Sequence, residues 1–140
     1  MRITKFETFF VKPRWLILKV HTDKDIVGVG EPILECRAHA CAAAVQEIGQ
    51  NIIGENPLEI ERLWQRMYRG GFYRGGPITM SAISGIEMAL WDIKGKTLGV
   101  PVYDLMGGKV REKIRMYTHV KAIAIKGGNT VDEMCQLAKK

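Results

Sequence analysis

The stretch GIEMALWDIKGKTLGVPVYDLMGG, residues 85–108, predicts one long helix, a break at Gly99-Val100-Pro101 and a short second helix. The long helix is apolar on too many sides for a surface helix. It also contains small residues at which another element can approach its backbone closely: Ser81, Ala82, Ser84, Gly85 and Ala89. The sequence therefore predicts a central helix that packs against more than one neighbour.

Two further helices precede this one. Residues 38–53 have apolar side chains at helical spacing, and Gly54 ends the pattern. Asn56 and Pro57 are suited to be the N-cap and first residue of the next helix, which ends at Gly70-Gly71. After the loop FYRGGP, the long helix begins near Pro77.

Before the helices, the chain is typical of β-structure. Residues 2–11, 15–20 and 26–31 are rich in β-branched and aromatic side chains, with short polar turns between them. Short connections favour an antiparallel meander. Gly28 and Gly30 inside the third strand indicate that another backbone passes close to it. We therefore predict an α+β fold in which a three-stranded antiparallel meander is followed by helices.

A different pattern begins near residue 113. Residues 114–120 predict a strand, and residues 131–140 predict the start of a helix with Asn129 or Thr130 as its cap. Strand, loop and helix form the first unit of a βα series, and one such unit cannot bury itself. We therefore expect one domain at 1–112 and the truncated start of a larger α/β domain at 113–140.

Composition narrows the classes of function. The 140 residues are 46% apolar and 26% charged, with no long apolar run and no secretory signal at the N-terminus. Three cysteines without CxxC spacing favour reduced thiols in the cytoplasm. The net charge of +6 is spread along the chain and mixed with acids, which favours a solvated surface over a nucleic-acid or membrane partner.

The long-helix region resembles a known family. The segments AISGIE (82–87), ALWD (89–92), Gly95-Lys96, Pro101-Val102 and LMG (105–107) are similar to the N-terminal signature of the mandelate racemase/muconate lactonising branch of the enolase superfamily. PRWLILKVHT, VGVGEPILECRA and LWQRMYRGGFYRGGPITMSAI resemble the sugar-acid dehydratases of that branch, the galactonate dehydratases most closely. The resemblance extends from residue 1 to about residue 120.

This resemblance implies a capping domain that covers the mouth of a TIM-type barrel, where the active sites of such barrels lie. It implies removal of a proton next to a carboxylate, with Mg²⁺ and a Lys or His base, followed by loss of the 3-hydroxyl to give a 2-keto-3-deoxy sugar acid. The resemblance implies that the metal ligands and the acid/base groups lie on barrel strands outside this chain. We therefore expect no catalytic or metal-binding residue here, an inactive chain when alone, and a homo-oligomeric protein. Mannonate or another aldonate remains an alternative substrate.

The resemblance also implies substrate contacts from the capping domain. They are Arg14, Glu35 and Arg37, and the end of the predicted first barrel strand adds His119. Glu35 can accept hydrogen bonds from sugar hydroxyls and Arg37 can hold a carboxylate. The alternatives are a solvated loop residue for Glu35, a structural salt bridge or helix-start contact for Arg37, and no role for His119. Trp15, beside Arg14, is expected in the core.

An alternative from another class of function is RNA binding. Residues 69–76 contain two RGG units with aromatic side chains between them, and such segments bind RNA through charge and stacking. This one is a short connection between two well-patterned helices, whereas RNA-binding RGG segments are long and disordered. A free-standing oligomeric binding module is the third possibility.

Overall fold

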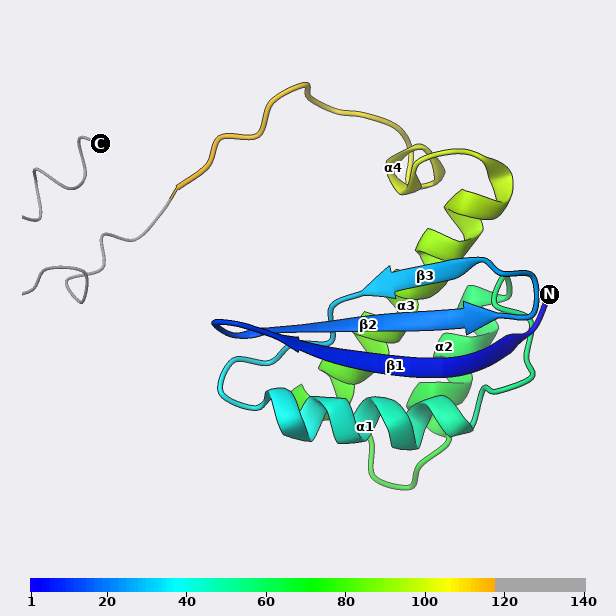
Figure 1. Ribbon diagram of the computed structural model, residues 1–140, viewed down its shortest axis with the longest axis vertical. Helices are drawn as coiled ribbons and strands as arrows, with labels where there is room; N and C mark the ends of the chain where they lie inside the picture. The colour runs from blue at the N-terminus through cyan, green and yellow to red at the C-terminus, as the bar shows by residue number, and fades with distance from the viewer. Residues whose placement is uncertain (118–140) are drawn as a thin grey trace, which may run out of the picture. The chain divides into compact units, whose positions relative to one another are not determined.

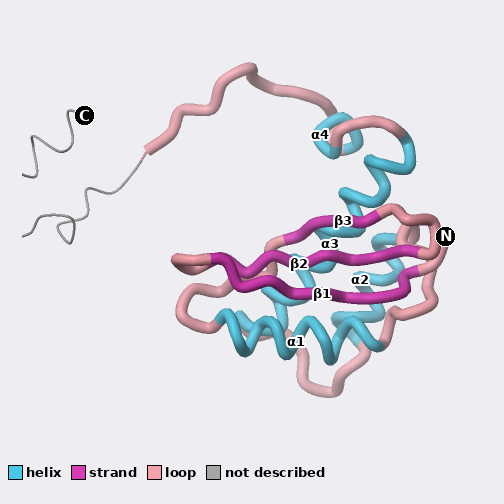
Figure 2. Tube along the Cα trace, viewed as in Figure 1, coloured by secondary structure: helices cyan, strands magenta, loops and turns pink. Residues whose placement is uncertain are grey.

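The computed structural model describes residues 1–117. It divides the chain into a compact unit, Met1–Gly108, and a second unit that begins at Lys109. The first unit contains three strands, β1 (Ile3–Val11), β2 (Trp15–Thr22) and β3 (Val27–Gly30), followed by four helices. The helices are α1 (Ala38–Gln50), α2 (Ile60–Arg69), α3 (Pro77–Leu98) and α4 (Val102–Leu105). The predicted α+β order of a meander followed by helices is therefore confirmed (Figures 1 and 2).

The strands form one antiparallel sheet in the order β1-β2-β3. Phe9 pairs with Ile17 and Glu7 with Lys19, whereas Lys19 in turn pairs with Val29 of β3. Side chains alternate between the two faces of the sheet. One face, with Phe6, Leu18 and Val20, is buried against the helices, while the other is open to solvent within Met1–Gly108.

α3 crosses the buried face of the sheet, and glycines set its distance from β3 (Figure 1). A Cβ atom at Gly30 would lie 1.9 Å from the carbonyl oxygen of Gly85, and one at Gly28 would lie 2.1 Å from that of Ala89. Gly85 in turn leaves room for Pro32, which a Cβ would meet at 2.5 Å. The close approach predicted from the small residues is therefore confirmed, with the sheet as the partner.

Two polar side chains of α3 complete the edge of β3. Asp92 Oδ2 accepts a hydrogen bond of 2.8 Å from the backbone N–H of Val29. Lys96 Nζ donates one of 2.7 Å to the carbonyl of Val27 and forms an ion pair with Asp92, also at 2.7 Å. Because an edge strand otherwise presents unpaired backbone groups, this clip both satisfies and blocks the β3 edge.

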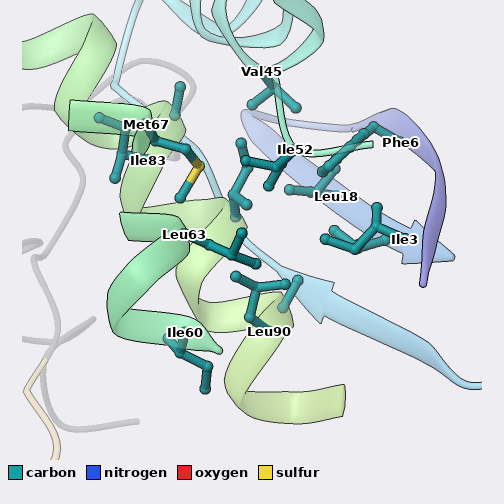
Figure 3. Close-up of a cluster of buried hydrophobic side chains, with 14 of the residues drawn as sticks. Ile3, Phe6, Leu18, Val45, Ile52, Ile60, Leu63, Met67, Ile83 and Leu90 are labelled. Atoms are coloured by element: carbon teal, nitrogen blue, oxygen red, sulfur yellow. The ribbon is translucent and has the colours of Figure 1, made fainter. Parts of the chain in front are cut away.

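The main core lies between the sheet and α1, α2 and α3. Ile3, Phe6 and Leu18 from the sheet meet Val45, Ile52, Leu63 and Met67 from the first two helices and their connection, and Ile83 and Leu90 from α3 (Figure 3). A smaller cluster of Leu16, Cys41 and Ala42 packs with Ile33, Leu34, Ala38 and Ile78. Burial raises the pKa of the Cys41 thiol, so this cysteine is a packing residue in its protonated form.

Several boundaries differ from the prediction. α1 ends at Gln50 instead of residue 53, because residues 51–54 form turns. α2 begins at Ile60, since Asn56 caps a preceding turn by accepting from the N–H of Leu58 at 3.2 Å. The ends of α2 at Gly70 and of α3 at a left-handed Gly99 are as predicted.

The predicted strand at 114–120 lies partly outside the described residues. Residues 114–117 are not assigned to a strand. The predicted helix at 131–140 lies outside the described residues. Within residues 1–117, no helix is long and apolar enough to span a membrane.

Candidate functional site

Two connections meet at one end of the sheet and bring three of the predicted site residues together. The first is the β1–β2 turn, with Arg14 just before β2. The second connection follows β3, contains Glu35 and Arg37, and ends where α1 begins at Ala38. The Arg14 guanidinium donates to the Glu35 carboxylate, so an ion pair joins the two connections.

A surface pocket of about 590 Å³ lies beside this ion pair. Its lining comes from both connections and from the first turn of α1: Pro13, Arg14, Ile33, Cys36, Arg37, Ala38, His39 and Ala40. The volume is in the range that small-molecule sites occupy. Two guanidinium groups at one pocket, of which only Arg14 is paired with a carboxylate among the described residues, make it suited to an anionic ligand.

The local sequence explains how this pocket is held. Ile33 and Leu34 pack into the small core cluster with Leu16 and Cys41, so the connection after β3 is anchored from below. The N–H of Arg37 donates to the carbonyl of Leu34 at 2.9 Å, which closes the turn that precedes α1. Cys36 adopts a left-handed φ of 62° in that turn. These constraints leave the polar side chains of residues 35–37 at the surface.

Each predicted contact residue has a definite place. The Glu35 side chain is 69% exposed, so it is an accessible carboxylate and not a buried one. Arg37 Nη1 donates to the carbonyl of Cys36 at 3.0 Å, which leaves most of its guanidinium donors available to a ligand. His119 lies outside the described residues.

Trp15 is not in the core, contrary to the prediction. Its side chain is 42% exposed, because it begins β2 at the turn end of the sheet and points to the face that the helices do not cover. The Arg14 guanidinium lies over the indole ring, 5.5 Å from its centroid, and this cation–π contact helps to orient Arg14.

His39 was not predicted as a site residue, although it lines the pocket. Its ring stacks on Phe10 at 4.4 Å between centroids, so it joins the first turn of α1 to the end of β1. The signal available in the sequence was its position, two residues after Arg37 at the start of the helix. The sequence contains no stronger indication of a role for His39, because its stacking partner, Phe10, is far away in the chain.

The other clusters of charged side chains hold elements of the fold together. Hydrogen bonds from Arg62 and then Arg66 hold the pKa of the Glu55 carboxyl below its ordinary value, and they tie α2 to the connection before it. On the open sheet face, Lys5 and then His21 lower the pKa of Glu7 in the same way. Within residues 1–117, no group of three His, Cys, Asp or Glu side chains could hold a metal ion.

The RGG segment forms the connection between α2 and α3. Phe72 and Tyr73 are more than nine-tenths exposed and pack edge-to-face at 5.2 Å. No described contact joins this connection to the Arg14–Glu35 ion pair.

Comparisons with known proteins agree with this architecture. Residues 6–107 match the model of the mandelate racemase / muconate lactonizing enzyme N-terminal domain. The chain is 59% identical over 120 residues to the D-galactonate dehydratase of Cronobacter sakazakii, covering 86% of this chain and 31% of that protein. It is 54% identical over all 140 residues to the D-galactonate dehydratase of Pectobacterium atrosepticum, covering 35% of that protein.

Among solved structures, an enolase from Pantoea ananatis with bound D-gluconate and Mg superposes with a TM-score of 0.74 and 39% identity. The match covers 78% of this chain and 28% of that one. This chain thus spans about a third of the length of the curated relatives that it matches. Its meander, its long glycine-containing helix and the matched residues 6–107 show that the chain belongs to the mandelate racemase / muconate lactonizing enzyme family, as an N-terminal domain of the enolase superfamily.

Proposed function

We propose that this chain is the capping part of a sugar-acid dehydratase that acts on D-galactonate. The observation that carries the proposal is the 54% identity, over every residue of the chain, to a protein named D-galactonate dehydratase. A solved neighbour holds D-gluconate, a related six-carbon sugar acid, which is consistent with this substrate class. The proposed reaction removes the proton at C2 and expels the 3-hydroxyl as water, leaving a 2-keto-3-deoxy acid.

In this proposal the chain binds and encloses the substrate and does not perform the proton transfers. Arg37 and Arg14 offer guanidinium groups to a carboxylate or to hydroxyl oxygens at the pocket. Glu35 accepts hydrogen bonds from sugar hydroxyls, and its ion pair with Arg14 positions both groups before the substrate arrives. His119, at the end of the predicted first barrel strand, is proposed as a further hydroxyl contact.

Mg²⁺ is proposed for the whole enzyme, where it would stabilise the negative charge that develops when the C2 proton leaves. The described part of this chain does not fit the ion, because it brings no three suitable side chains together. Its ligands, like the base and the acid, are proposed to lie in the barrel. We further propose that the enzyme works in the cytoplasm as a homo-oligomer.

A chimera tests the proposal. Residues 1–140 of this chain would replace the matching 140 residues of the Pectobacterium relative, which supplies the rest of the enzyme. The purified chimera would be incubated with Mg²⁺ and with D-galactonate, D-mannonate or D-gluconate, and 2-keto acid formation would be measured. We expect turnover of D-galactonate above the other two, and none from the 140-residue chain alone.

A chimera that melts cooperatively but dehydrates none of the three acids would contradict the proposed function. Preference for D-mannonate would favour the alternative substrate. For the RNA-binding alternative, an affinity of the 140-residue chain for single-stranded RNA that falls steeply with salt would be the supporting result.

A further inference from the structure

His39 is a polar side chain of the pocket whose chemistry the proposed function does not use. It lines the pocket from the first turn of α1 and is exposed. Within the described residues 1–117, its ring takes part in no hydrogen bond or ion pair. Both ring nitrogens therefore keep their capacity to donate or accept a hydrogen bond.

Phe10 restrains the orientation of this ring. The two ring centroids are 4.4 Å apart and the ring planes differ by 29°, so the rings are stacked. The contact joins the end of β1 to the start of α1, which lie at the same end of the unit (Figure 1). Without it, an exposed histidine on a helix turn would rotate among its rotamers. Because stacking uses a face of the imidazole, it leaves the edge of the ring, where both nitrogens lie, open to a ligand.

Arg14 is held in the same way on the other connection of the pocket. Its guanidinium lies over the Trp15 ring, 5.5 Å from the centroid, and Nη1 donates to Glu35. A cation–π contact uses the face of the guanidinium, so the remaining N–H donors at its edge stay available. The pocket thus has two planar polar groups, each supported by an aromatic side chain of the meander. Their free edges suit a ligand with several hydroxyl groups, since each hydroxyl both donates and accepts.

We propose that His39 is a further substrate-contacting residue, which forms a hydrogen bond with a hydroxyl group of the sugar acid, and that Phe10 is its positioning residue. This role rests on the proposed function, because it requires a sugar acid in the pocket. The groups on C2 and C3 take part in the reaction, so the hydroxyls on C4, C5 and C6 are those left for recognition. A site that pairs with a hydroxyl discriminates against an acid that lacks it, because the polar group of the site is then left unpaired.

His39→Phe separates the hydrogen bond from the stack. A phenyl ring is similar in size to the imidazole and can still stack on Phe10, but it has no nitrogen. In the chimera with the Pectobacterium barrel, KM for D-galactonate should rise by about three- to tenfold, as expected for the loss of one hydrogen bond. The change in kcat should be smaller, because His39 does not transfer the proton. His39→Gln, which keeps a donor and an acceptor, should recover part of the affinity.

The matched control is His21→Phe, the same substitution at a histidine of β2 on the open face of the sheet. We expect it to leave KM unchanged. Thermal melts of every chimera would show that each variant is folded.

Phe10→Leu tests the positioning role. It should raise KM in the wild-type background and have little further effect in the His39→Phe background, where no nitrogen remains to be oriented. A second readout does not depend on turnover. In the 140-residue chain, stacking on Phe10 shifts the ring protons of His39 upfield in NMR spectra, and Phe10→Leu should remove that shift.

Galactonate analogues that lack the hydroxyl on C4, C5 or C6 identify the contact. We expect His39→Phe to raise KM for two of the three analogues and to leave it unchanged for the third, which lacks the hydroxyl that His39 binds. The wild-type chimera should bind this third analogue more weakly than D-galactonate.

The possible failures are distinguishable. A folded wild-type chimera that dehydrates no sugar acid would overturn the proposed function, and the role of His39 with it. In an active chimera, a KM that His39→Phe leaves unchanged, or a rise that is equal for all three analogues, would overturn the role of His39 alone. Equal effects of Phe10→Leu in both backgrounds, or ring-proton shifts that it leaves unchanged, would overturn the positioning role of Phe10.

Discussion

Substituting Gly30 by alanine tests whether the contact between β3 and α3 determines the fold. The new Cβ would lie 1.9 Å from the Gly85 carbonyl oxygen, 1.5 Å short of the 3.4 Å at which ordinary contact begins. Backbone oxygen cannot move aside as a flexible side chain can, so β3 and α3 must separate along their contact. Overpacking typically costs about 1–3 kcal/mol, and a clash between two backbones belongs at the upper end.

Opposing this cost, alanine restricts the unfolded chain and thereby stabilises the fold by about 0.4–1 kcal/mol. We therefore expect a net loss of about 2–3 kcal/mol, which is a large share of the about 5–15 kcal/mol that a domain of this size has. The melting temperature should fall by about 8–24 °C, at about 4–8 °C per kcal/mol. Urea unfolding followed by circular dichroism would measure the change in free energy.

Gly71→Ala is the matched control. Its Cβ would meet its nearest atom, the Tyr73 carbonyl oxygen, at an ordinary 3.4 Å, in an exposed connection. We expect it to be within about 0.5 kcal/mol of wild type. If Gly30→Ala were as stable as Gly71→Ala, the reasoning that β3 needs glycine at residue 30 because the α3 backbone lies against it would be refuted.

Two further predictions concern the charged groups of the same unit. Asp92→Ala removes the acceptor of the Val29 N–H and the ion-pair partner of Lys96. We expect it to lower the free energy of unfolding in urea by about 1–2 kcal/mol, and the control Asp104→Ala, at an exposed residue, to lower it by less than about 0.5 kcal/mol. Equal losses would show that the contacts of Asp92 with Val29 and Lys96 do not stabilise the fold. Glu55 has a pKa lowered from 4.5 by hydrogen bonds from Arg62 and then Arg66, so its contribution to stability is present above that value and is lost as the pH falls below it through the folded-state pKa. The difference in melting temperature between wild type and Glu55→Gln should therefore shrink as the solution is acidified below pH 4.5, whereas a difference that stays constant would contradict this assignment.

The elements that sequence patterns predicted well are those governed by local chemistry. The three strands, the end of α3 at Gly99 and the close approach at Gly28 follow from turn residues, a left-handed cap and the absence of a side chain. Each of these features is determined within a few residues of the chain.

The features that were not predicted depend on contacts between distant segments. Trp15 has the composition of a core residue, and its exposure follows only from knowing which face of the sheet the helices cover. The Arg14–Glu35 ion pair joins residues of two connections, and the stacking of His39 on Phe10 joins a helix to a strand. Neither leaves a periodic pattern in the sequence. The start of α2 was predicted too early for a local reason: the Asn56 side chain can cap a turn as well as a helix, and here it caps a turn.

The most direct test of the proposed role of this chain is the effect of Arg37 on substrate affinity. In the chimera with the Pectobacterium barrel, KM and kcat for D-galactonate would be measured for Arg37→Gln and for the exposed control Arg69→Gln. Loss of a charged contact to the substrate costs about 1.5–3 kcal/mol, so KM should rise by about tenfold or more for Arg37→Gln, with a smaller change in kcat and none in the control. An unchanged KM in the folded Arg37→Gln chimera would contradict the claim that this pocket of the capping domain contacts the sugar acid.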